Sequence, residues 1–63
     1  MKLWIARDNY GFLGLYKKCP IWGKINELDE DWKGEFIAIL PKSFFTEVTF
    51  ENSPQVVELK IIK

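Results

Sequence analysis

Apolar residues occur in short runs, and turn-forming residues interrupt these runs along the whole chain. The longest uninterrupted apolar run is Phe36–Leu40, and no segment shows the 3.6-residue period of a long helix. Runs of this length that are bounded by Gly, Pro, Asn or Asp are typical of β-strands. We therefore predict strands over residues 2–7, 12–17, 21–25, 35–40 and 56–62.

These strands predict a single small all-β domain that spans residues 1–63. A chain of 63 residues buries only about 60% of its unfolded surface, so the length allows one core and no second domain. The spacing of the strands favours an antiparallel meander or a partly open barrel of four or five strands, with one short helical turn.

Three connecting segments carry recognisable turn signals. Residues 8–11 combine Asx residues with a glycine, which predicts a β-hairpin between the first two strands. Pro41 can begin a short helix, so residues 41–45 are predicted as the single helical turn. Asn26 can cap a helix and Gly34 can end one. Since two turns are marginal without packing, we predict residues 26–34 as a loop with at most one helical turn.

The alternation of side chains along the strands predicts the core. In the last strand, for example, Val57, Leu59 and Ile61 share one face, and Glu58 and Lys60 share the other. The predicted core consists of Leu3, Ile5, Leu13, Leu15, Phe36, Ile37, Ile39, Phe44, Val57, Leu59 and Ile61.

The residue types disfavour catalysis. The chain has no His, which is the commonest general base in enzymes. Cys19 is the single cysteine, no imidazole can activate it, and no metal-ligand spacing surrounds it. We therefore expect no enzyme activity, no catalytic residue, no metal site and no cofactor. A lone cysteine also favours a reducing, cytoplasmic setting.

The charge balance limits the partners. The chain has nine Lys and Arg residues and nine Asp and Glu residues, so its net charge is zero. Positive and negative charges are also equal in number within each half of the chain. This balance removes the usual driving force for binding nucleic acid or anionic lipid. The apolar runs are also too short to span a bilayer, so we expect no membrane partner.

Aromatic side chains are the strongest candidates for binding. Trp and Tyr are enriched at the centres of protein interfaces, and an unpaired sheet edge can accept a strand from a partner. We therefore predict an accessory protein-interaction module that acts through a sheet edge or an aromatic face, on a protein partner or a second copy. The predicted contact residues are Trp4, Tyr10, Tyr16, Trp22 and Trp32.

The alternative function is binding of single-stranded nucleic acid. Small β domains bind single strands by stacking bases on exposed aromatic rings next to basic side chains. This alternative predicts that Trp4, Tyr16 or Trp22 lie exposed on one face. It also predicts that three lysines surround them, namely Lys17, Lys18 and Lys24.

Two terminal segments carry a family resemblance. Residues 4–8 read Trp-Ile-Ala-Arg-Asp, and residues 47–54 read Glu-Val-Thr-Phe-Glu-Asn-Ser-Pro. With these motifs the chain resembles a family of short, uncharacterised proteins from gut bacteria and their phages or mobile elements. The chain departs from the pattern at Thr46, where proline is usual, so a rigid turn is less well supported there. The resemblance implies a small accessory protein and assigns no functional residue.

Overall fold

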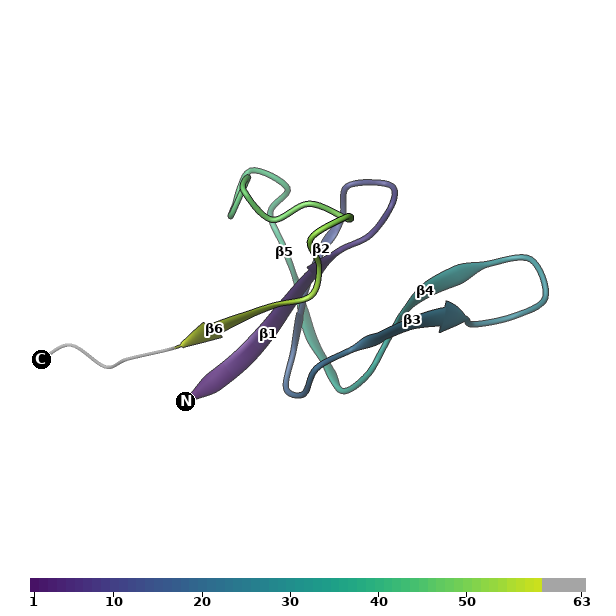
Figure 1. Cartoon of the computed structure of the whole chain (residues 1–63), viewed down its shortest axis with the longest axis horizontal. Helices are drawn as coiled ribbons and strands as arrows, with labels where there is room; N and C mark the ends of the chain where they lie inside the picture. Colours follow the sequence, from purple (N-terminus) through teal and green to yellow (C-terminus); the bar gives the residue numbers. More distant parts are fainter. Residues whose placement is uncertain (59–63) are drawn as a thin grey trace, which may run out of the picture.

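The computed structural model describes residues 1–58, which contain six β-strands and no helix (Figure 1). The strands are β1 (Lys2–Arg7), β2 (Leu13–Tyr16), β3 (Ile21–Lys24), β4 (Glu30–Lys33), β5 (Phe36–Leu40) and β6 (Gln55–Glu58). The prediction of a small all-β fold with antiparallel strands is confirmed. Within the described residues, no helix is long and apolar enough to cross a membrane.

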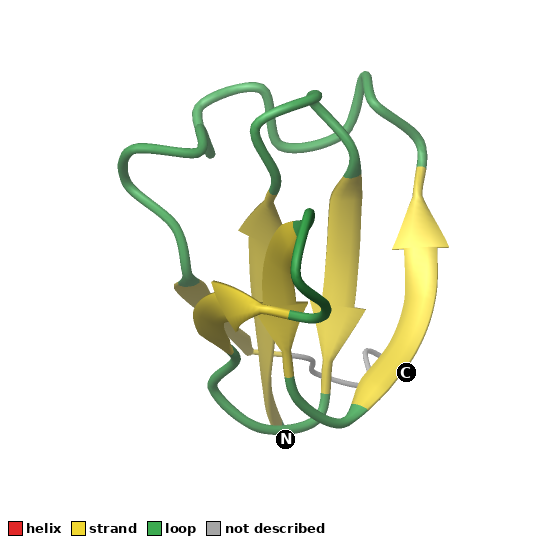
Figure 2. Ribbon diagram, turned by 90° about the vertical axis from the view of Figure 1, so that its right-hand side faces the viewer, coloured by secondary structure: helices red, strands yellow, loops and turns green. Residues whose placement is uncertain are grey.

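The strands form two separate sheets. Four of them make an open antiparallel sheet in the order β5-β2-β1-β6, and β3 pairs only with β4. Figure 2 shows the β3–β4 hairpin lying in front of the four-stranded sheet. Residues 41–54 lead from β5 at one edge of the sheet to β6 at the other. This strand order is that of a Greek key, in which the fourth strand returns to lie beside the first.

The turn between β1 and β2 is built by Asp8. Its carboxylate Oδ1 accepts hydrogen bonds from the backbone N–H groups of Tyr10 (2.8 Å) and Phe12 (2.9 Å). Gly11 follows with a φ of 91°, a conformation that residues with a Cβ rarely adopt. Local side-chain acceptors and one glycine therefore fix this hairpin, as the sequence predicts.

The core lies on one face of the four-stranded sheet, beneath residues 41–54. Ile5 and Leu13 point to this face, and Val48 covers them from the connecting segment. Three partly buried side chains surround this cluster, namely Leu15, Leu40 and Val57. Because the core has so few members, the position of the 41–54 segment matters for stability.

The side chain of Arg7 holds the 41–54 segment against the sheet. Its guanidinium donates hydrogen bonds to five backbone carbonyl groups, with Nε to Val48 O at 2.6 Å as the shortest. The other four acceptors are the carbonyl oxygens of Gly11, Lys42, Phe44 and Phe45, at 2.8 to 3.3 Å. A planar guanidinium suits this role, since it presents several donors in one fixed plane.

Residues 26–34 differ from the prediction. Glu30–Lys33 form the strand β4, which pairs with β3 through Trp22 opposite Trp32. Asn26 does form a local cap, because its Oδ1 accepts the N–H groups of Leu28 and Asp29. This cap closes a hairpin loop, and no helical turn follows it. The strand was missed because Glu30 and Asp31 have low β-propensity.

The helical turn predicted over residues 41–45 is a hydrogen-bonded turn, not a helix. The N–H of Phe44 bonds to the carbonyl of Pro41 at 3.0 Å, and Phe45 then adopts a φ of 49°. The left-handed conformation of Phe45 ends the turn at once. It also helps to orient the carbonyl groups of this segment toward Arg7.

The predicted core is correct for residues of β1 and β2, and it is wrong for residues of β5 and of the segment that follows β5. Leu3, Ile5 and Leu13 are buried. Four members predicted as buried are exposed, namely Phe36, Ile37, Ile39 and Phe44. The other buried hydrophobic side chains are those of Ala6, Tyr16 and Val48. Leu59 and Ile61 lie outside the described residues.

Candidate functional site: an apolar sheet edge and a polar groove

Trp22, Trp32 and the unpredicted Phe50 form one aromatic cluster. Trp22 and Trp32 lie opposite one another in the β3–β4 hairpin, with ring centroids 5.3 Å apart. Phe50 lies 4.7 Å from Trp22 and 6.3 Å from Trp32 in edge-to-face contacts. The indole N–H of Trp32 also donates to the carbonyl oxygen of Arg7 at 3.0 Å. These half-buried rings therefore attach the hairpin to the rest of the fold.

The other predicted contact residues lie in separate places. Tyr10 is 74% exposed at the tip of the β1–β2 hairpin. Trp4 is half-buried in β1, between Tyr16 of β2 and Val56 of β6. The expected exposure of Tyr16 is wrong, since only 6% of it is accessible. The five predicted residues therefore do not form one aromatic face.

The most exposed apolar element of the four-stranded sheet is β5. This strand pairs with β2 on one side, and its other side has no strand partner among residues 1–58. Phe36, Ile37 and Ile39 are 53%, 48% and 61% exposed. Ile37 lies at a register shift, where it has no partner in β2. Ile39 lies opposite Gly14, which has no side chain to cover it.

Sequence reasoning missed this edge because a run of five apolar residues is typical of a buried strand. The signal that was available is the set of three residues that flank the run. Glu35 precedes the run, and Pro41 and Lys42 follow it. Proline and charged residues at strand ends are frequent at sheet edges.

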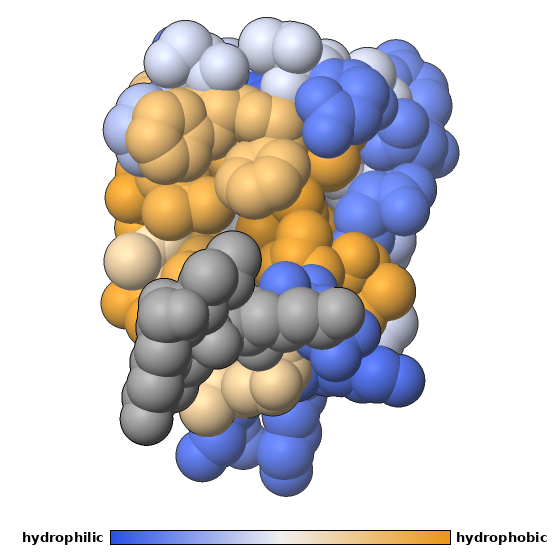
Figure 3. Space-filling model, turned by 90° about the vertical axis from the view of Figure 1, so that its left-hand side faces the viewer, coloured by the Kyte–Doolittle hydropathy of each residue, from blue (hydrophilic) through white to orange (hydrophobic). Residues whose placement is uncertain are grey.

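The face of the four-stranded sheet that carries the core has an apolar hollow of about 440 Å³. Its lining includes Leu15, Leu40, Phe44 and Val57, from the face of the sheet and the 41–54 segment. Seen from that side, apolar side chains form one broad area that hydrophilic side chains border (Figure 3). The fold therefore leaves apolar surface exposed on both faces of the sheet near its edges.

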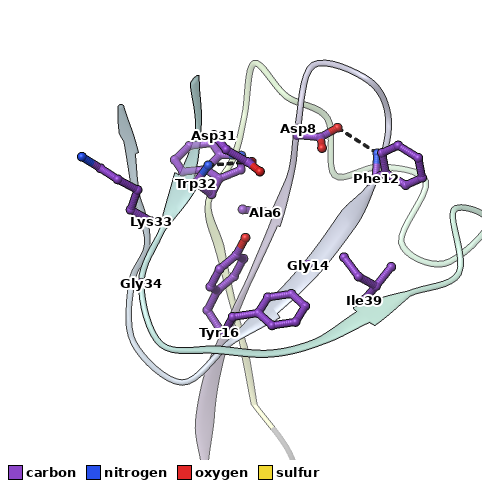
Figure 4. A pocket seen from close by; sticks show the side chains of 11 residues that line it. Ala6, Asp8, Phe12, Gly14, Tyr16, Asp31, Trp32, Lys33, Gly34 and Ile39 are labelled. Carbon is purple, nitrogen blue, oxygen red and sulfur yellow. Dashed lines mark hydrogen bonds between the residues drawn. The ribbon is translucent and has the colours of Figure 1, made fainter. Parts of the chain in front are cut away.

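A second hollow of about 440 Å³ has a mixed lining of polar and apolar residues, and it lies between the sheet and β4 (Figure 4). We call this hollow the polar groove. Its floor is formed by Ala6, Gly14 and Tyr16, and one wall by Asp31 and Trp32. The full lining is Ala6, Asp8, Phe12, Gly14, Tyr16, Asp31, Trp32, Lys33, Gly34, Phe36 and Ile39.

The ring of Tyr16 is fixed in the polar groove by Gly14. A Cβ atom at position 14 would lie 2.8 Å from Cε1 of Tyr16 and 2.9 Å from its hydroxyl oxygen, so only glycine leaves room for the ring. Phe36 contacts the same ring edge-to-face at 5.7 Å. Burial raises the pKa of the Tyr16 hydroxyl, and the negative charges of Asp31 and Asp8 raise it further.

The described residues contain no group of three or more His, Cys, Asp or Glu side chains that is arranged to hold a metal ion. Cys19 is exposed, in the segment between β2 and β3. No protein-family model matches the chain, and comparison with curated proteins and with solved structures finds no match either. The resemblance to short proteins of gut bacteria and their phages therefore stays a prediction.

Proposed function

We propose that this chain is a non-catalytic protein-interaction module that binds an extended partner segment along the free edge of β5. The observation that carries the proposal is the exposure of Phe36, Ile37 and Ile39 on a strand with one unpaired side. In β-strand addition, backbone hydrogen bonds supply affinity, and alternate side chains supply specificity.

The residues around β5 define the chemistry of the partner segment. Between Glu35 and Lys42 the strand carries no charge, so the matching segment is apolar over about five residues. An antiparallel segment with an acidic N-terminal end and a basic C-terminal end places its charges opposite Lys42 and Glu35. Glu35 already lies 3.5 Å from Lys18, but both side chains are exposed, and exposed pairs are weak.

The sequence of residues 35–42 itself has this pattern, so a capped peptide of that sequence is the probe. On titration into isotope-labelled protein, we expect saturable shifts of the backbone amide signals of β5. Ile39→Lys is expected to abolish these shifts, since it places a charge in the apolar edge. The matched control is Ile21→Lys, which introduces the same charge at an exposed residue of β3.

Three outcomes would overturn the proposal. They are the absence of shifts, shifts that occur outside β5, and an equal response of the Ile39→Lys and Ile21→Lys variants. Amide exchange in the complex gives a second readout, because strand addition slows exchange at the outward-facing amides of β5.

The alternative of single-stranded nucleic-acid binding has less support. Tyr16 is buried, and the rings of Trp22 and Trp32 pack on each other and on Phe50. These contacts and the burial of Tyr16 reduce the aromatic surface on which bases could stack. The equal numbers of acidic and basic residues also provide no net attraction to phosphates.

A further inference from the structure

The free edge of β5 carries a charge pattern that is complementary to itself when the strand runs in the opposite direction. Glu35 precedes the apolar residues Phe36–Leu40, and Lys42 follows them after Pro41. In an antiparallel pair, the start of one strand lies beside the end of the other. A second copy of β5 therefore brings opposite charges together at both ends of the pair.

The pairing of β5 with β2 sets the level of each β5 residue along the sheet. Residues 38, 39 and 40 lie opposite residues 15, 14 and 13 in a regular register. Ile37 is then extra, so that Phe36 lies opposite Tyr16. The carbonyl oxygen of Glu35 accepts the N–H of Lys17 at 2.8 Å and continues this series. Glu35 therefore lies three levels from residue 39, although the two are four positions apart in the sequence.

This spacing selects Ile39 as the position of a twofold axis between two copies. Lys42 follows Ile39 by three positions, so an antiparallel copy that meets the first at Ile39 places its Lys42 level with Glu35. The axis is perpendicular to the sheet, and side chains on one face therefore stay on that face. The two Ile39 side chains lie opposite one another, and Ala38 lies opposite Leu40 of the second copy.

The side chains at this edge suit such a contact. Ile39 is 61% exposed and lies opposite Gly14, so Ile39 of a second copy would cover apolar surface that β2 leaves open. On the other face, the small side chain of Ala38 leaves room for Leu40 of the second copy. Leu40 lines the apolar hollow together with Phe44, which is 49% exposed. The contact therefore covers apolar surface on both faces of the sheet.

The charged side chains at the two ends of β5 can turn toward a second copy. Glu35 lies 3.5 Å from Lys18, and these side chains are 54% and 76% exposed. The ammonium of Lys42, which is an exposed residue, lies 4.2 Å from the ring centroid of Phe12. Exposed contacts of these two kinds are weak, so exchanging them for a contact between copies costs little.

We propose that the partner at β5 is a second copy of this chain, and that two copies pair antiparallel about a twofold axis at Ile39. Their four-stranded sheets then form one continuous sheet. This inference rests on the function proposed above and names its partner. Twofold dimers are the commonest oligomers, and both copies contribute the same patch to the interface. Because the paired strand is short, the interface is small, and we expect a dissociation constant on the order of 100 µM.

Sedimentation velocity over a concentration series from about 10 µM to about 1 mM spans this dissociation constant. We expect the unmodified protein to change from monomer to dimer within the series. Ile39→Lys is expected to stay monomeric, because it places two like charges at the axis. The matched control, Ile21→Lys at an exposed residue of β3, is expected to dimerise like the unmodified protein. A monomer throughout the series, or an equal response of the two variants, would refute the dimer.

Two charge variants test the antiparallel arrangement. Glu35→Lys makes both ends of the edge basic, and Lys42→Glu makes both ends acidic, so each variant alone is expected to dimerise about tenfold more weakly. An equimolar mixture of the two should recover association, and so should the variant that carries both substitutions. Each of these combinations again places opposite charges together. No recovery in either case would contradict the arrangement. Thermal unfolding of each variant verifies that it is folded.

Ile39→Cys tests the position of the axis, in a Cys19→Ser background that removes the native thiol. Directly opposite residues of an antiparallel pair have Cα atoms about 4.5–5.5 Å apart, which is within the range of a disulfide. With oxidised glutathione as the oxidant, we expect covalent dimers of this variant. Ile21→Cys in the same background is the control and is expected to give few. Equal yields would show random collision and exclude the axis at Ile39.

Titration of the residue 35–42 peptide into dilute protein separates this inference from the proposed function. If the peptide shifts the β5 amide signals but the protein stays monomeric at about 1 mM, the second copy is not the partner and the edge still binds an extended segment. If the protein dimerises and neither the peptide nor Ile39→Lys affects the dimer, both the inference and the proposed function fail. Dimerisation that the peptide inhibits supports both.

Discussion

The indole N–H of Trp32 donates a hydrogen bond to the backbone carbonyl oxygen of Arg7 at 3.0 Å, across 25 positions of sequence. This bond joins β4 of the small hairpin to the last residue of β1 in the main sheet. It also brings Asp31 next to the face of the sheet that carries Tyr16. The polar groove therefore depends on the docking of the hairpin.

Trp32→Phe is expected to lower the free energy of unfolding by about 1–3 kcal/mol, because it leaves the carbonyl of Arg7 without its donor. Trp22→Phe is the control. Trp22 belongs to the same ring cluster, but its N–H makes no hydrogen bond with the described residues. Urea unfolding measures both values. A larger loss for Trp22→Phe would show that ring packing, not the hydrogen bond, anchors the hairpin.

Arg7→Lys is expected to destabilise the fold by about 2–3 kcal/mol, although it keeps the charge. An ammonium has three donors on one atom and cannot reach five carbonyls that surround a planar guanidinium. The control is Lys24→Arg at an exposed residue of β3, which measures the effect on stability of exchanging lysine and arginine where no such hydrogen bonds are made. Chemical denaturation tests this, and a loss below about 0.5 kcal/mol, the usual range at surface positions, contradicts the role given to Arg7.

Gly14→Ala is expected to cost about 1–3 kcal/mol, since the new methyl group would overlap the Tyr16 ring. Gly23→Ala provides the control, because there the added Cβ meets only the flexible end of Lys33. In the Tyr16→Leu background the cost of Gly14→Ala should shrink. A double-mutant cycle measures this coupling, and strictly additive effects would disprove the contact.

Stability is expected to fall at alkaline pH through Tyr16. Its pKa in the folded protein is raised above the ordinary 10.0, by burial first and then by Asp31 and Asp8. The folded state therefore keeps the proton where the unfolded chain loses it. This contribution is complete below about pH 10 and is lost as the pH rises toward the folded-state pKa. Tyr16→Phe should flatten the alkaline part of the curve of stability against pH. An unchanged slope would show that Tyr16 does not cause the alkaline loss of stability.

A short oligothymidylate is expected to bind weakly or not at all, and without the steep salt dependence of phosphate recognition. Fluorescence of the tryptophans is a direct readout, since base stacking quenches indoles. Strong binding that weakens between low and moderate salt would restore the nucleic-acid alternative and displace the interaction function proposed for β5.

Local chemistry made part of the fold predictable. The Asx turn at Asp8 and the positive φ of Gly11 need only neighbouring residues, so the first hairpin follows from composition. The second hairpin was missed because its pairing depends on Trp22 and Trp32, which lie ten positions apart. The acidic residues between them carry no strand signal of their own.

The candidate sites were less predictable than the strands. Phe36, Ile37 and Ile39 have the same apolar character as a core strand, and only the strand order makes β5 an edge. The polar groove combines residues from β2 and β4 with a turn, and no spacing in the sequence relates them. Tyr16 was predicted as an exposed contact residue, but only 6% of it is accessible, and it lines the groove.

The sequence by itself determined that this protein is built from short antiparallel strands, because alternation and turn residues act over a few neighbouring positions. Tertiary structure alone decided which strand lies at the edge, where the 41–54 segment is held by Arg7, and which side chains line the hollow between the sheet and β4. Those features arise from contacts between residues 25 to 41 positions apart, and the energy of such contacts depends on burial and geometry that exist only in the folded chain.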